Sequence, residues 1–127
     1  MLALERLNAT RIVALPRAID TAVWPDDALA FRLAADEVLV TAAEAATAVD
    51  DPHAIVEHET GFSFVWLEHV TAVDFLEREC DWELPDERPA FAQGLVAGLP
   101  LKIWFERERV LFVVASPFAA DLTERLR

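Results

Sequence analysis

The single cysteine and one of the three histidines are the first residues of this chain that could do chemistry together. A thiolate beside an imidazole is the arrangement of a cysteine nucleophile and its base. Cys80 and His69, however, lie in a stretch with helical spacing. Eleven residues of helix separate their Cα atoms by about 16 Å along the axis, which excludes a shared proton. We therefore interpret Cys80 as a small buried residue on the apolar face of that helix, with a reactive thiol as the alternative.

A second set of candidate ligands lies between residues 53 and 59, where histidines and glutamates follow one another closely. These residue types bind metal ions, and they are His53, Glu57, His58 and Glu59. Because side chains alternate along a strand, His58 is expected opposite both glutamates. We predict no metal site here, and we expect these residues at a solvated strand edge.

The nucleotide-binding and hydrolase motifs are missing from the sequence. The chain has three glycines, and they form no Gly-x-Gly-x-x-Gly run, no Gly-Lys-Ser/Thr loop and no Gly-x-Ser-x-Gly elbow. We predict no catalytic residues and no cofactor bound by this chain alone.

The charge balance is strongly acidic, with 11 Lys and Arg against 23 Asp and Glu and a net charge of −12. Nucleic acid is a poor candidate partner, because binding it depends on cations that neutralise phosphates. Half of the net charge lies in residues 68–88, which contain eight acidic residues and only two basic ones, Arg78 and Arg88. We interpret this acidic segment as a solvated helix face and loop, with a docking surface for a basic partner as the open alternative.

No apolar run approaches the roughly 20 residues that span a bilayer, so we expect no membrane segment. The single cysteine, which excludes an internal disulfide, favours a cytoplasmic location.

The aromatic residues are the most informative feature. Hydrophobic residues make up 54% of the chain. In the expected strands, Phe62, Phe64 and Trp66 share one face. Along another strand, Trp104 points to the face opposite to that of Leu101, Ile103 and Phe105. Three short helices cover about one face of such a sheet, so the other face needs another cover. We predict that Phe62, Phe64, Trp66 and Trp104 bind a protein, although the N-terminal segment could fold over them instead.

The elements that position these residues follow from the periodicity. Residues 1–27 form an irregular or partly stranded segment, and residues 28–127 form a single α+β domain. The pattern predicts hairpins over 29–40 and 54–67, the second turning at Thr60-Gly61. It predicts helices from Thr41 to about Asp50, with capping-box spacing to Glu44, and over 70–80.

The last third of the chain predicts strands over 91–97, 100–105 and 110–115, with a turn at Gly98-Leu99. Ser116 and Pro117 then supply an N-cap and a first-turn proline for a closing helix. The expected order is ββα, ββα, βββα, a mostly antiparallel sheet with three short helices. The repeated hairpin-then-helix unit hints at an internal duplication.

Four stretches in register resemble the gamma subunit of heterotetrameric sarcosine oxidase, from about Leu29 to the C-terminus. Arg32–Val40 is similar to that family's strand, Pro-Asp-Glu-Trp-Leu and second strand, with Ala35 and Val38 replacing the proline and tryptophan. Leu67–Leu76, followed by Cys80 and Leu84, resembles Leu-x-Gly-Pro-x-Ala-x-x-x-Leu, Cys and Asp-Leu, with His69 and Val70 in the Gly-Pro positions. Phe91–Leu101 and Val113–Ala119 resemble the Ala-Gln-Thr-x-Leu-Ala-Gly-Val-Pro-Val and Ser-Phe-Ala motifs.

The resemblance implies a short variant of that family, with the folate-binding fold of the related aminomethyltransferase. It implies an accessory or assembly subunit without chemistry of its own, and any activity would belong to the oxidoreductase complex of one-carbon metabolism. The flavins and NAD are expected on larger partner subunits. A second copy of the chain could also cover the same apolar sheet face in a homodimer. The alternative function is that of a stand-alone folate-type binding module or a small enzyme of one-carbon metabolism.

Overall fold

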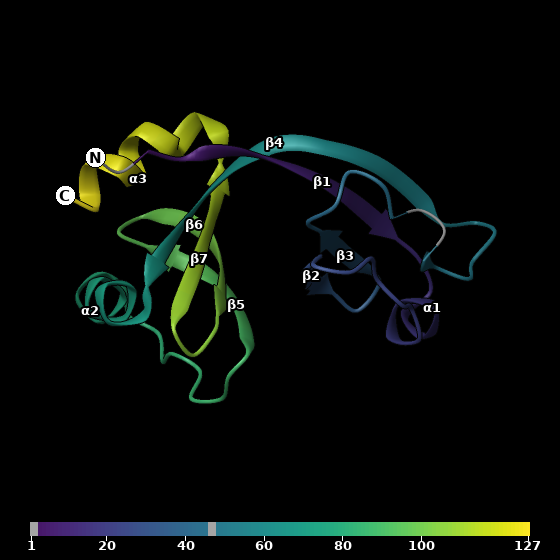
Figure 1. Ribbon diagram of the computed structural model, residues 1–127, viewed down its shortest axis with the longest axis horizontal. Helices are drawn as coiled ribbons and strands as arrows, with labels where there is room; N and C mark the ends of the chain where they lie inside the picture. The colour runs from purple at the N-terminus through teal and green to yellow at the C-terminus, as the bar shows by residue number, and fades with distance from the viewer. Residues whose placement is uncertain (1–2, 46–47) are drawn as a thin grey trace. The chain divides into compact units, whose positions relative to one another are not determined.

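The seven strands that the structure describes form one sheet, in which hydrogen-bonded neighbours follow the order β2-β3-β1-β4-β7-β6-β5. The strands are labelled in Figure 1. The computed structural model describes residues 3–45 and 48–127. The strand pairs β1–β3, β2–β3, β4–β7, β5–β6 and β6–β7 are antiparallel. Within the described residues, the expected mixed α+β class with a mostly antiparallel sheet and three short α-helices is confirmed. The elements are β1 (Glu5–Val13), α1 (Pro16–Asp20), β2 (Ala30–Ala34), β3 (Glu37–Val40), β4 (Ile55–Glu68), α2 (His69–Glu79), β5 (Ala90–Val96), β6 (Leu99–Phe105), β7 (Arg109–Ala115), the 3₁₀ turn η2 (Ser116–Phe118) and α3 (Ala119–Arg125).

The chain divides into two compact units. The N-terminal unit is Leu7–Thr60, and the C-terminal unit is Gly61–Arg127 together with the first residues of the chain. Each contains a strand, a helix and an antiparallel meander whose last strand pairs with the first. These strands are β1 and β3 in one unit, and β4 and β7 in the other. The repeated arrangement is therefore strand–helix–meander, and the expected hairpin-then-helix order is wrong.

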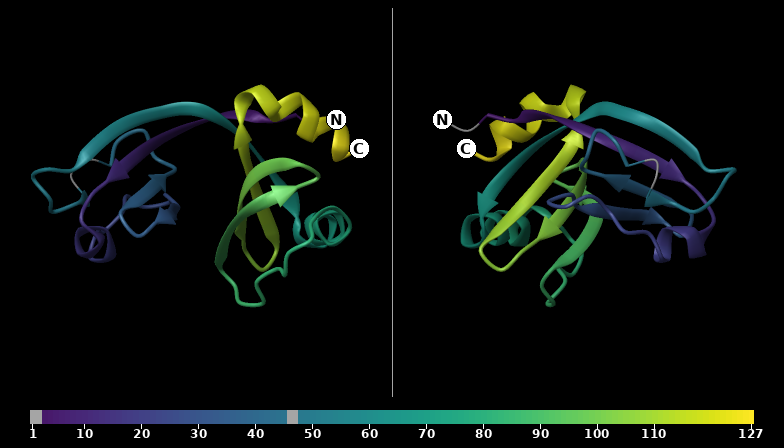
Figure 2. Two further views of the ribbon diagram at one scale, coloured as in Figure 1. Left: turned by 180° about the vertical axis from the view of Figure 1, so that it is seen from behind. Right: turned by 45° about the vertical axis from the view of Figure 1, so that its right-hand side comes forward.

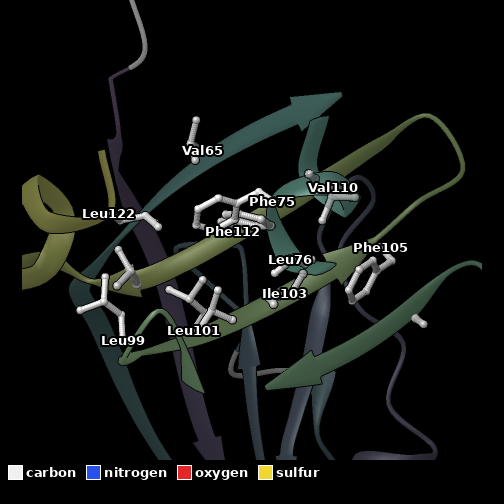
Figure 3. Close-up of a cluster of buried hydrophobic side chains, with 14 residues drawn as sticks. Val65, Phe75, Leu76, Leu99, Leu101, Ile103, Phe105, Val110, Phe112 and Leu122 are labelled. Carbon is white, nitrogen blue, oxygen red and sulfur yellow. The ribbon is translucent and has the colours of Figure 1, made fainter. Parts of the chain in front are cut away.

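The core of the C-terminal unit lies between one face of its sheet and the helices α2 and α3 (Figure 3). The two central strands each place alternate apolar side chains on this face, as the period of two requires. Phe75 of α2 packs on Phe112 of β7, with ring centroids 5.9 Å apart. Leu122 of α3 is fully buried in the same cluster. Figure 2 shows α2 beside these strands from two further directions.

The core of the N-terminal unit joins β1 and β3 to α1. Ile12 lies opposite Val38 in the ladder, and both pack with Ile19 of α1. Residues 1–27, expected to be irregular or partly stranded, thus contain a nine-residue strand and a short helix. The second half of β1, Thr10–Val13, is regular because it pairs with β3, which lies more than twenty residues further along the chain.

The helix expected from Thr41 is wrong over the described part of that range. Residues 41–45 and 48–50 contain bends and a short 3₁₀ turn, and residues 46–47 lie outside the described residues. The Thr41 hydroxyl accepts the Leu29 N–H at 2.8 Å, and the Thr41 N–H donates to the Leu29 carbonyl at 2.9 Å. These bonds extend the β2–β3 ladder, so the hydroxyl does not cap a helix.

The second expected hairpin is also wrong, because β4 runs straight through Thr60-Gly61. Among the described residues, positive φ angles occur at Asp27, Ala97 and Gly98, and not at Gly61. Gly61 is therefore part of an extended strand. From Phe62 onward β4 pairs with β7, a partner about fifty residues away that local composition does not reveal.

Other expectations are confirmed: the first hairpin, α2, β5, β6, β7 and the closing helix. The β5–β6 turn has Ala97 and Gly98 at φ of 52° and 81°, the pair of positive angles that tight hairpins favour. The Ser116 side chain does not cap the closing helix and instead lies 2.8 Å from the Ser63 hydroxyl. In residues 3–45 and 48–127, no helix is long and apolar enough to cross a membrane.

Candidate protein-binding surface

The four aromatic residues singled out in the sequence lie on one sheet face of the C-terminal unit. Trp66 of β4 and Trp104 of β6 both lie opposite Leu111 of β7, on its two sides. Phe62 and Phe64 follow Trp66 at the strand period of two, so they share its face. The core residues Val65 and Phe112 point to the opposite face, under α2. We call Phe62, Phe64, Trp66 and Trp104 the aromatic face.

The aromatic face is half-buried. All four side chains have intermediate exposure, while Leu111 and Val113 of the central strand β7 are 3% and 1% exposed. The central strand of this face is therefore buried, and the four rings keep part of their apolar area accessible. Aromatic residues and arginine are enriched at protein interfaces, whose centres are apolar.

Two cations lie over these rings. The Arg109 guanidinium lies 3.7 Å from the centroid of the Trp66 ring, and the Lys102 ammonium lies 5.1 Å from that of Phe62. Such contacts contribute about 0.5–1 kcal/mol each at exposed sites. The long stems also cover apolar surface while their charged ends remain in water.

Glu106 connects the two tryptophans. One of its carboxylate oxygens accepts the Trp104 indole N–H at 3.0 Å, and the other accepts the Arg109 Nε–H at 2.9 Å. Trp66, Arg109, Glu106 and Trp104 thus form one continuous polar–aromatic chain across the end of the β6–β7 hairpin. Lys102, Glu106 and Arg109 were not predicted from the sequence. Lys102 follows the same alternation as Trp104, so it was open to detection, whereas Arg109 required the β4–β7 register.

The acidic segment, residues 68–88, covers the outer side of α2 and the following loop. Arg88 fixes this loop: it donates to the Pro85 carbonyl at 2.7 Å and to His69 Nε2 at 3.3 Å. Its guanidinium also lies 4.9 Å from the centroid of the Phe105 ring. The arginine is therefore a structural tie, while Asp74 and Glu77 remain exposed on the helix.

Cys80 and His69 lie at opposite ends of α2, as their spacing predicted. Burial raises the pKa of the Cys80 thiol, and the nearby Asp81 carboxylate raises it further. A raised pKa lowers the thiolate fraction near neutral pH, which makes the thiol a poor nucleophile.

The residues proposed and set aside as metal ligands lie on or near the first half of β4. In residues 3–45 and 48–127, no group of three or more His, Cys, Asp or Glu side chains is placed to hold a metal ion. Glu57 lies 3.4 Å from Arg11, which also pairs with Glu37. This glutamate therefore belongs to a small surface ion-pair network of the N-terminal unit.

Asp51 organises the loop before β4, a role that the sequence did not indicate. Its two carboxylate oxygens accept the Leu15 N–H at 3.0 Å and the His53 N–H at 2.9 Å. These hydrogen bonds, that of Leu15 first, hold the pKa of Asp51 below its ordinary value of 3.8. The carboxylate links the start of α1 to the start of β4.

The fold and this surface define the chain as a mixed α+β protein with an aromatic, cation-capped sheet face. No protein-family model and no curated protein matches the sequence. The resemblance to the sarcosine oxidase gamma subunit stays a prediction.

Proposed function

We propose that this protein is a non-catalytic accessory subunit that binds a larger protein through the aromatic face. The observation that carries the proposal is the arrangement of Trp66 and Trp104 around Leu111, both half-buried and joined through Arg109 and Glu106. The proposed setting is the cytoplasm, and the proposed fold relationship is to the folate-binding aminomethyltransferase.

Interface energetics support this use of the surface. Tryptophan and arginine dominate the few positions that carry most of the binding energy at protein interfaces. An aromatic side chain contributes a large contact area and loses little conformational entropy, because it has only two side-chain torsions. Here Glu106 and Arg109 hold both tryptophans in place before any partner arrives, which lowers the ordering cost of association.

The sequence resemblance supports the choice of partner. It covers residues 29–127, and it implies larger subunits that carry flavins and NAD. In this proposal the chain brings no cofactor and no reacting group, and its contribution is to complete the assembly. Its acidic charge of −12 then also acts in solution by keeping the free subunit from self-association.

The test uses the purified full chain and the larger subunits of a heterotetrameric sarcosine oxidase from the same organism, prepared without their gamma subunit. Sedimentation velocity is expected to show the chain moving with the large subunits, and the chain alone is expected to show no flavin absorbance and no sarcosine oxidation. Independent sedimentation of the two components contradicts the proposal. Turnover or a yellow chromophore in the isolated chain contradicts it equally.

A further inference from the structure

A hollow of about 480 Å³ lies at one end of the C-terminal unit, apart from the aromatic face. It lies between the end of α2 and the β5–β6 turn. Its lining residues, which define what we call the Trp82 hollow, are Glu79, Asp81, Trp82, Leu95, Ala97 and Gly98.

The walls of the Trp82 hollow are fixed by two hydrogen bonds. The Trp82 indole N–H donates to the Leu95 carbonyl at 2.9 Å, and the ring lies against Gly94 so closely that a Cβ there would be 2.9 Å from it. On the other side, the Ala97 N–H donates to the Glu79 carbonyl at 2.8 Å. These bonds join the hairpin turn to the helix end, so the hollow exists without a ligand.

The chemistry of the hollow is apolar inside and acidic at its rim. The Trp82 ring is half-buried, and Ala97 and Gly98 of the β5–β6 turn complete the uncharged part of the lining. Glu79 and Asp81 are exposed, and neither carboxylate forms an ion pair with the described residues. Both belong to the acidic segment, where acids outnumber bases by eight to two. An occupant must therefore offer an apolar side chain next to a cation.

We propose that the Trp82 hollow docks a basic, amphipathic peptide segment of a protein partner. An apolar side chain of the segment packs on the Trp82 ring, and a neighbouring lysine or arginine lies between the Glu79 and Asp81 carboxylates. Charge complementarity selects this occupant. A second copy of this chain carries the same charge of −12 and is repelled, and the phosphates of a nucleic acid are repelled as well.

This inference rests on the proposed function for the protein nature of the partner, and it uses none of the residues of the aromatic face. A randomised dodecapeptide library displayed on phage is selected against the full chain. The enriched peptides are expected to combine a lysine or arginine with an adjacent leucine, methionine or phenylalanine. A failure to enrich any peptide, or enrichment of peptides without basic residues, overturns the proposal.

The best enriched peptide, made with a fluorescent label, is then titrated in polarisation experiments against three variants. The double variant Glu79→Gln/Asp81→Asn is expected to bind about tenfold more weakly. The control Asp74→Asn/Glu77→Gln makes the same charge change on α2 two to five residues before Glu79, and it is expected to change affinity less than twofold. Equal losses of peptide affinity in the two double variants would show that only the overall charge matters, and they would overturn the proposal that the peptide binds in the Trp82 hollow.

The third variant separates this inference from the proposed function. Trp66→Glu alters the aromatic face and is expected to leave peptide binding unchanged. If the peptide binds Trp66→Glu as it binds the wild type, while the large subunits of sarcosine oxidase do not bind the chain, the proposed function is wrong. The proposal that the Trp82 hollow docks a basic peptide is then still supported. If the large subunits bind the chain and the peptide experiments fail, the hollow alone is refuted.

Discussion

Replacing Gly94 by alanine tests how the Trp82 indole is held against β5. An added Cβ would lie 2.9 Å from both Cε2 and Nε1 of the ring, whereas ordinary contacts are 3.4–4 Å. The ring must then retreat by about 0.5 Å. The retreat strains the hydrogen bond from its N–H to the Leu95 carbonyl, which is 2.9 Å long.

The magnitude follows from three effects on the free energy of unfolding. Forcing an extra carbon into a packed contact costs about 1–3 kcal/mol. Losing the indole hydrogen bond costs about 0.5–1.5 kcal/mol. Alanine in a strand returns about 0.5–1 kcal/mol relative to glycine, because it restricts the unfolded chain. We expect Gly94→Ala to lower the free energy of unfolding by about 1–3 kcal/mol.

Urea unfolding, followed by far-ultraviolet circular dichroism, measures this change in two backgrounds. In a Trp82→Ala chain the clash is absent, so Gly94→Ala is expected to stabilise the fold by about 0.5–1 kcal/mol. The reversal of sign corresponds to a coupling energy of at least about 1.5 kcal/mol between the two positions. An identical effect of Gly94→Ala in both backgrounds would refute the contact.

Three further predictions concern single residues. Ala97→Gly relieves a positive φ of 52° and is expected to stabilise the fold by up to about 1 kcal/mol, whereas Gly98→Ala, at φ of 81°, is expected to destabilise it by about 1 kcal/mol or more. Thermal unfolding measures both changes, and the opposite order of stability would contradict the positive φ angles of this turn. Because the hydrogen bonds to Asp51 lower its pKa below 3.8, its contribution to stability is present above pH 3.8 and is lost as the pH falls through the pKa of the folded state. The difference in unfolding free energy between wild type and Asp51→Ala should therefore shrink in acid, and a constant difference from about pH 7 to pH 3 would contradict the lowered pKa. Because burial raises the pKa of Cys80 above 9.0, iodoacetamide is expected to alkylate the native thiol at pH 8 more slowly than the guanidinium-unfolded one, and equal rates refute the shift.

Local periodicity predicted the parts of this fold that neighbouring residues specify. The spacing of Ala72 and Leu76 placed α2 correctly, and the alternation in 101–105 placed β6. It failed where distant partners decide the conformation. Thr41 has the composition of a helix cap, but Leu29 uses its hydroxyl, and Gly61 continues a strand because β7 pairs with the residues that follow.

The candidate sites show the same limit. Alternation alone placed Phe62, Phe64 and Trp66 on one face, because strand geometry is local. The cation over Trp66 required the pairing of Glu68 with Arg109, which joins residues about forty positions apart. Likewise, the close contact of Trp82 with Gly94 depends on how the loop after α2 folds back on β5, and no sequence motif marks it.

The central claim, that the aromatic face binds a protein, is tested most directly by one charged substitution within it. Trp66→Glu is compared with Val23→Glu, which places the same charge on a side chain that is 84% exposed in the N-terminal unit. Removing a central interface aromatic costs about 2 kcal/mol or more of binding energy, so complex formation should weaken at least about 30-fold.

Sedimentation velocity with the large subunits, alongside circular dichroism of each variant, gives the result. Trp66→Glu is expected to stay folded and no longer to move with the large subunits, while Val23→Glu is expected to bind as the wild type does. An unfolded Trp66→Glu chain would show that the ring belongs to the protein's own core, since losing a buried aromatic costs about 3–5 kcal/mol. That outcome, or a folded variant that still binds at full strength, would contradict the claim.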